Sequence, residues 1–132
     1  MTGPLRILYV DDDDDIRTIA TMSLRLDDDV DVRTASSGRE ALEMLADNPA
    51  WRPQVILLDV MMPGMDGFEV HRALETAPGL ASVATIFMTA RASRAGMDEY
   101  RAAGAAGVIL KPFDPLGLAK EVRSIVGEVG GT

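Results

Sequence analysis

The chain has 132 residues, which predicts a single domain over residues 1–132, with a core of about 5–127 and a frayed tail at 128–132. Its apolar content of 47% excludes a disordered chain, and its net charge of −8 argues against direct nucleic-acid binding, because phosphate backbones select basic surfaces. The sequence has no membrane-length apolar run, no signal peptide and no cysteine, so we expect a cytoplasmic protein that does not bind membranes.

The first half of the chain alternates short apolar runs with amphipathic segments. Leu5–Val10 and Val30–Ala35 have the apolar and β-branched content of strands, and 54–59 is a third such run that a Pro-Gly turn closes. Between them, the periodicity predicts a helix over 14–26 and a second over Gly38–Asp47, which the preceding serines can cap. The side chains predicted to face the core from the first helix are Ile16, Ile19, Ala20, Ser23 and Leu24.

The second half continues the alternation. A helix is predicted over 66–76, with the aspartate at its start as N-cap, followed by a strand at Ala84–Thr89. The segment 94–103 is rich in alanine and weakly amphipathic, so we expect it to be the least firmly packed helix. A fifth strand is predicted at 108–110, and a proline at position 115 suits the start of the last helix.

This alternation predicts the fold class. Continuous apolar strands separated by amphipathic helices indicate a parallel sheet that is covered on both faces. We therefore expect an α/β fold with a doubly wound five-stranded parallel sheet and five helices. In the strand order 2-1-3-4-5, the first and third strands flank the topological switch point, and ligands bind outside the carboxyl ends of the strands.

Three carboxylates follow the first and third predicted strands. Asp59 ends the third strand, where it could serve as a cap, a metal ligand or a nucleophile. Asp11 and Asp12 follow the first strand, and packing like charges together there raises a pKa unless a cation is present. Mg²⁺ prefers carboxylate oxygens, so the three aspartates predict a magnesium site. For the next three aspartates, 13–15, we favour a solvated turn and helix start.

Two more polar side chains end predicted strands. The fourth strand ends in Thr89, and the fifth is followed by Lys111 and Pro112. Each alone is unremarkable, since a strand-end threonine is usually structural and a lone lysine is usually solvated. Together with the aspartates, they predict a phosphoryl site in which lysine and Mg²⁺ neutralise oxygens and threonine donates a hydrogen bond. Asp59 would then attack phosphorus as a carboxylate nucleophile.

These motifs, in this order, resemble the receiver domain of bacterial two-component response regulators, a CheY-like family. The resemblance covers essentially the whole chain. Its motifs are LYVDD at the first strand, LLDVMMPGMDG around Asp59, MTA at Thr89 and KPF at Lys111. It implies a CheY-like, flavodoxin-like fold and a phosphoprotein in which a histidine kinase or phosphotransfer protein phosphorylates Asp59.

The resemblance also implies roles for individual residues around Asp59. Asp12 and Asp59 would bind Mg²⁺ directly, Asp11 would help through water, and the backbone carbonyl of Met61 would complete the protein ligands. The side chain of Met61 would also tune how water reaches the phosphoryl group, together with that of Arg91. Since Met61 cannot orient an attacking water, we expect a phosphorylated form that is not unusually short-lived.

The resemblance implies three further features around Thr89 and Lys111. Thr89 and Lys111 would bind the phosphoryl oxygens, and the peptide bond before Pro112 would be cis. Receivers commonly carry an aromatic residue three positions before the lysine, where this chain has Val108. We therefore expect a shift of Thr89, transmitted through the helix 94–103, in place of an aromatic rotamer switch. For Tyr100, in that helix, we expect a packing role.

Two other functions remain as alternatives. A phosphohydrolase of the haloacid dehalogenase type also combines aspartate, threonine, lysine and Mg²⁺, but it needs a later acidic pair and leaves Asp59 unexplained. A receiver-like docking module that is never phosphorylated would not need the chemical residues that this chain retains. His71, the only histidine, is expected at the surface and without a phosphohistidine role.

The preferred hypothesis is a phosphorylation-activated switch and not a metabolic enzyme, with only self-phosphorylation and slow autodephosphorylation. We expect a single-domain protein without a DNA-binding output part. Its output would be binding to a downstream protein through the segments 94–103 and 108–110 and the last helix. We expect a monomer or a weak dimer that depends on phosphorylation.

Overall fold

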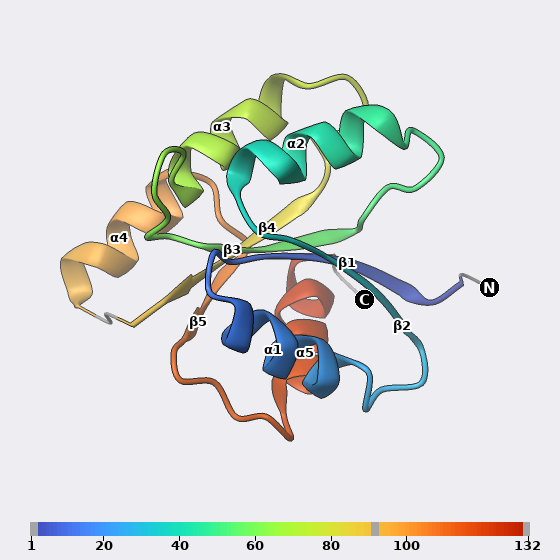
Figure 1. Ribbon diagram of the computed structural model, residues 1–132. Coiled ribbons are helices and arrows are strands. Elements are labelled where there is room, and N and C mark those ends of the chain that lie inside the picture. Colours follow the sequence, from blue (N-terminus) through green and yellow to red (C-terminus); the bar gives the residue numbers. More distant parts are fainter. Residues whose placement is uncertain (1–2, 91–92, 131–132) are drawn as a thin grey trace.

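A computed structural model describes residues 3–90 and 93–130, and it contains one parallel sheet with helices on both faces (Figure 1). The strands are β1 (Leu5–Val10), β2 (Val30–Ala35), β3 (Val55–Asp59), β4 (Ala84–Thr89) and β5 (Gly107–Leu110). The helices are α1 (Asp14–Leu24), α2 (Gly38–Asp47), α3 (Gly67–Thr76), α4 (Arg94–Ala102) and α5 (Leu118–Gly130). The strand order is β2-β1-β3-β4-β5, so the predicted doubly wound fold is confirmed.

The sheet separates two apolar clusters. Because successive side chains of a strand point to opposite faces, Tyr9 and Leu57 enter one cluster while Leu8 and Leu58 enter the other. The first cluster is completed by α1 and α5, and the second by α2, α3 and α4 (Figure 1). In the part of the chain that the structure describes, no helix is long and apolar enough to span a membrane.

Side-chain caps fix where four helices begin, with Ser93 serving α4. The predicted Asp66 cap is confirmed: its carboxylate accepts from the backbone N–H of Glu69, and the Glu69 carboxylate accepts in return from the N–H of Asp66. This reciprocal pair satisfies two backbone donors at the start of α3. Ser37 caps α2 in the same position, and Asp13 caps α1, so one member of the aspartate run has the structural role expected of it.

Several boundaries differ from the prediction, most of them by a single residue. α5 begins at Leu118 and not at Pro115, because Asp114 accepts backbone hydrogen bonds from Leu116 and Gly117 and closes a turn there. α5 also continues to Gly130, past the predicted start of the tail at 128. α1 ends at residue 24 and not at 26, and the side chain of Ile19 is 47% exposed although it was expected to face the core.

His71 was predicted at the surface, and this prediction is wrong. Its side chain is buried on the inner face of α3, where Nδ1 lies 2.8 Å from Thr85 Oγ1 and Nε2 lies 2.7 Å from the carbonyl oxygen of Ala103. A carbonyl can only accept, so Nε2 carries a hydrogen and donates it to Ala103, while Nδ1 is hydrogen-bonded with the threonine hydroxyl. The imidazole therefore ties α3 to β4 and to the end of α4. Its spacing of three residues from Leu74 was the signal that it shares the apolar face.

The substitution His71→Leu tests this tie. It leaves the Thr85 hydroxyl and the Ala103 carbonyl without their partner, so we expect the free energy of unfolding to fall by about 1.5 kcal/mol. Urea unfolding followed by circular dichroism measures the change. The neighbouring exposed residue provides the control, since Arg72→Leu should change stability by less than about 0.5 kcal/mol. Equal effects of the two substitutions would contradict the assigned role.

Candidate functional site

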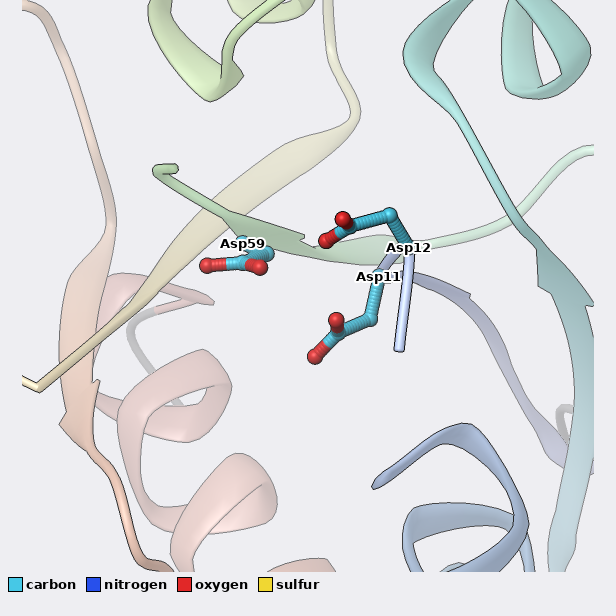
Figure 2. A group of neighbouring side chains, drawn as sticks. All are labelled: Asp11, Asp12 and Asp59. Atoms are coloured by element: carbon cyan, nitrogen blue, oxygen red, sulfur yellow. The ribbon is translucent and has the colours of Figure 1, made fainter. Parts of the chain in front are cut away.

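Three carboxylates meet at the carboxyl ends of the two central strands. Val10 pairs with Leu58 in the register of β1 and β3, so the residues that follow them reach the same edge of the sheet. One carboxylate oxygen from each of Asp11, Asp12 and Asp59 lies within 4.8 Å of the other two (Figure 2). Asp11 and Asp59 are buried, whereas Asp12 is exposed.

The donor set fits Mg²⁺. Hard divalent cations take carboxylate oxygens, and Mg²⁺ is held by a few of them while it keeps several waters. Asp12 lies at the open side of the cluster, and this leaves a solvent-accessible face for the remaining ligands. The carboxylates line a pocket of about 590 Å³ together with Lys111 and the acidic start of α1.

Lys111 places its ammonium between the two buried carboxylates. Nζ lies 2.8 Å from Asp11 Oδ2 and 3.3 Å from Asp59 Oδ2. Burial alone would lower the pKa of Lys111, but the hydrogen bond to Asp11 and the charges of both carboxylates outweigh it and raise this pKa above its usual value. The lysine is therefore a fixed positive charge at neutral pH. The peptide bond between Lys111 and Pro112 is cis, as the resemblance implied.

Asp59 has a raised pKa of about 6. Burial is the largest cause and the negative charge of Asp11 the second, while Lys111 and the backbone N–H of Met61 act in the opposite direction. That N–H donates to Asp59 Oδ1 over 3.3 Å. Above its pKa the carboxylate is ionised and poorly solvated, and this is the state in which a carboxylate is a competent nucleophile.

Asp11 is held by groups that the sequence did not point to. Its carboxylate accepts from the hydroxyl of Tyr9 over 3.3 Å and from the backbone N–H of Asp13 over 3.0 Å, while its carbonyl accepts from Arg17 over 2.7 Å. Burial and the nearby carboxylates raise the pKa of Tyr9, so the phenol remains a hydrogen-bond donor. The period of two along β1 puts Tyr9 and Asp11 on one side of the strand, and this was the available signal.

Thr89 ends β4 beside Asp59. In the register of the two strands Asp59 pairs with Met88, so Thr89 is one residue further along the neighbouring strand. Its side chain is buried, and its Oγ1 accepts from the hydroxyl of Tyr100 over 3.2 Å. The structure therefore brings together Asp11, Asp12, Asp59 and Lys111 around one pocket and places Thr89 at the adjacent strand end.

Comparison with known proteins agrees with this geometry. The sequence model of the response regulator receiver domain family matches residues 7–123 of this chain. This chain belongs to the receiver domain family. This chain is 38% identical over 127 residues to the response regulator MprA of Mycolicibacterium vanbaalenii, and the match covers 93% of this chain and 51% of that protein. It is 37% identical over 121 residues to the response regulator PleD of Caulobacter vibrioides, covering 91% of this chain and 26% of that protein.

Solved structures give the same fold. The chemotaxis protein CheY4 of Vibrio cholerae superposes with a TM-score of 0.81 at 34% identity, over 93% of this chain and 99% of that one. Receiver domains as a family bind Mg²⁺ at an acidic cluster such as the one that Asp11, Asp12 and Asp59 form here. This receiver domain spans about a half or a quarter of the length of the curated relatives it matches.

The other residues that the resemblance singled out are Met61, Arg91 and Val108. The side chain of Met61 is 79% exposed, while its backbone N–H contacts Asp59. Arg91 lies outside the described residues. Val108 is partly buried and packs against the apolar cluster that contains Phe87 and Tyr100, so the position three residues before the lysine holds a small apolar side chain.

Gly67 holds the start of α3 close to Asp59. A Cβ at this position would lie 2.8 Å from the carbonyl oxygen of Asp59 and 3.1 Å from the Cα of Val60. Both are backbone atoms and cannot move aside without displacing the strand end.

The substitution Gly67→Ala therefore tests how the nucleophile is held. We expect it to lower the free energy of unfolding by about 1.5 kcal/mol and to slow phosphorylation of Asp59, because overpacking shifts the backbone that carries the carboxylate. Urea unfolding and the rate of phosphorylation by acetyl phosphate measure the two effects. Gly3→Ala is the control, since a Cβ there has no neighbour within 4 Å. A Gly67→Ala protein that matches this control in both measurements would contradict the prediction.

Proposed function

We propose that this receiver domain is a phosphorylation-activated switch in which Asp59 accepts a phosphoryl group from a histidine kinase or a phosphotransfer protein. An Asp59 oxygen forms a bond to phosphorus while the P–N bond of the donor phosphohistidine breaks, and the released electron pair returns to the imidazole nitrogen. The observation that carries the proposal is the position of Asp59, which is buried beside Asp11 and within 3.3 Å of the Lys111 ammonium.

The other side chains of the site support this transfer. Asp11, Asp12 and Asp59, with the carbonyl of Met61, would hold Mg²⁺, which offsets the negative charge of the carboxylates and of the phosphoryl oxygens when it is bound. Lys111 would exchange its contact with Asp59 for one with a phosphoryl oxygen, since its ammonium is already directed at the nucleophile. Catalysis here consists of positioning and charge stabilisation, so no further acid or base is needed.

An apolar hollow of about 180 Å³ adjoins the acidic pocket and offers a surface for the phosphodonor. Its lining residues are Ile16, Ile19, Lys111, Pro112, Phe113 and Pro115. Lys111 lines both depressions, so a protein seated on the hollow brings its histidine to the mouth of the acidic pocket. We propose that this surface receives the donor, in keeping with the exposure of Ile19.

We propose that output is a change in protein binding on the face formed by α4, β5 and α5. Leu110 is 47% exposed there, and a depression of about 400 Å³ beside it is lined in part by Met97, Val108 and Phe113. The acidic charge of −8 favours a protein partner over nucleic acid. Phosphorylation would alter this face in a protein that stays monomeric, or it would favour a weak dimer that forms through this face.

The receiver domain would not be a turnover enzyme. Beyond accepting the phosphoryl group, its own reaction would be slow hydrolysis of the aspartyl phosphate, because the Met61 side chain has no group that can orient water. A half-life of seconds or less for the phosphorylated protein would contradict this.

Incubation with acetyl phosphate and Mg²⁺, followed by mass spectrometry of the intact protein, tests the function. We expect the mass of one phosphoryl group to be added to the wild type and to Asp28→Asn, an exposed control, but not to Asp59→Asn. Added mass that survives Asp59→Asn would overturn the assignment, and failure of the wild type to gain mass would indicate a docking module. Continuous release of phosphate from a small phosphomonoester would instead indicate a phosphohydrolase.

A further inference from the structure

The hydroxyl of Tyr100 links α4 directly to the end of β4. It donates to Thr89 Oγ1 over 3.2 Å, and both side chains are buried. Among the α4 residues whose side chains are described, Tyr100 alone is buried. The tyrosine therefore connects this helix to the threonine.

The ring of Tyr100 is held in an aromatic cluster with two other elements. It stacks on Phe68 of α3 with centroids 5.7 Å apart and lies 5.5 Å from Phe87 of β4. Phe87 is paired with Val108 in the register of β4 and β5, and valine has no group that can hydrogen-bond with a hydroxyl. Contrary to our expectation of packing alone, Tyr100 combines packing with a polar contact at the site.

The surroundings of the ring allow it to move. A groove of about 820 Å³ between the β3–α3 loop and α4 is lined by Thr89, Tyr100, Phe68 and Gly96, among others. Gly96 carries no side chain on the preceding turn of α4, and even a Cβ there would remain 3.9 Å from the Tyr100 ring. A shift of the ring toward the groove therefore meets little side-chain volume.

We propose that Tyr100 is a positioning residue that couples Thr89 to α4. Its hydroxyl holds the threonine side chain toward the helix. When a phosphoryl group on Asp59 binds that side chain, the hydrogen bond between Tyr100 and Thr89 breaks and α4 loses this contact with β4. The inference rests on the proposed phosphorylation of Asp59. Thr89 accepts from Tyr100 and would donate to the phosphoryl oxygen, so the competition is over the position of its side chain. A hydrogen bond to an anionic oxygen is about twice as strong as one between two neutral hydroxyls, so the threonine is drawn toward Asp59 and out of reach of the Tyr100 hydroxyl.

This coupling has a reciprocal consequence. If binding of an anion at Asp59 costs the Tyr100–Thr89 hydrogen bond, removing that bond in advance must tighten binding of the anion. In Tyr100→Phe we therefore expect beryllofluoride with Mg²⁺, a mimic of the phosphoryl group, to bind about five-fold more tightly, the change expected for one neutral hydrogen bond. The amide NMR signals of α4 should respond to beryllofluoride at most half as strongly as in the wild type.

Phe68→Leu is the matched control, since it loosens the aromatic stack and keeps the Tyr100 hydroxyl. We expect its beryllofluoride affinity to stay within about two-fold of the wild type, because no hydrogen bond is lost. Urea unfolding checks that both variants are folded. An equal gain in affinity in the two variants would assign the effect to packing and overturn the proposal, as would an unchanged affinity in Tyr100→Phe.

The chain contains two tyrosines, so selective ¹³C labelling of tyrosine gives two assignable ring signals. We expect the Tyr100 signal to shift when beryllofluoride and Mg²⁺ bind to the wild type, and to shift without them in Thr89→Ala. If beryllofluoride binds at Asp59 and the Tyr100 signal stays in place, this inference fails while the proposed function stands. If neither beryllofluoride nor acetyl phosphate reacts at Asp59, the proposed function fails.

Discussion

Replacing Lys111 with methionine is expected to lower the free energy of unfolding by about 3 kcal/mol at pH 7 in metal-free buffer. The methionine retains most of the apolar stem and removes the ammonium that lies 2.8 Å from Asp11 and 3.3 Å from Asp59. Removing one partner of a buried ion pair leaves the other charge uncompensated, and here two carboxylates lose the same cation. Urea unfolding measures the loss.

The dependence of this loss on pH and Mg²⁺ separates electrostatics from packing. Without Lys111 the pKa of Asp59 rises further, so the loss should shrink as the pH is lowered and Asp59 takes up a proton. Mg²⁺ should restore part of the stability, because it replaces the missing positive charge. The exposed Lys120→Met variant is the control and should stay within about 0.5 kcal/mol of the wild type. A Lys111→Met protein whose loss is the same at pH 4 and pH 7 would argue against the electrostatic cause.

The opposite effect is expected at the nucleophile: Asp59→Asn should raise the free energy of unfolding by about 2 kcal/mol at pH 7 in metal-free buffer. Burial and Asp11 raise the pKa of Asp59 from 3.8 to about 6. The folded protein therefore binds a proton that the unfolded chain has released, and its stability falls as the pH rises from about 4 to about 6. Asparagine has the same shape without the charge, so it removes this penalty and leaves Lys111 paired with Asp11.

Two measurements test this prediction. The difference between Asp59→Asn and the wild type should be absent below about pH 4, grow through the window up to pH 6 and stay constant above it. Addition of Mg²⁺ should stabilise the wild type more than the variant, because the variant lacks one of the three carboxylates. The exposed substitution Asp28→Asn should leave both profiles unchanged. A less stable Asp59→Asn protein at pH 7 would refute the account of the raised pKa.

Much of the fold follows from sequence patterns that are local. Leu5–Val10, Val30–Ala35 and Ala84–Thr89 were predicted to the residue, and proline or polar residues bound the first two of these runs. The strand ends then placed Asp59 and Lys111 at one edge of the sheet, since parallel strands share the direction in which they end. The pocket was thus predictable from strand boundaries and chain order alone.

What the sequence did not reveal depends on contacts between distant elements. His71 is buried because Thr85 and the Ala103 carbonyl provide the partners that a buried imidazole needs, and neither is near it in the chain. The bond from Tyr100 to Thr89 likewise joins α4 to β4. The late start of α5 is a local error, since the turn closed by Asp114 competes with the helix start that a proline favours.

The two tyrosines of the chain contact the site from opposite faces of the sheet, one at Asp11 and the other at Thr89. Tyr9 belongs to the cluster beneath α1 and α5 and contacts Asp11, whereas Tyr100 belongs to the cluster beneath α2, α3 and α4 and contacts Thr89. A protein bound over one helical layer and a protein bound over the other would therefore influence the same chemistry through separate side chains. The two routes lie on opposite faces of the sheet and meet at the aspartate cluster, where the charge of Asp11 acts on Asp59.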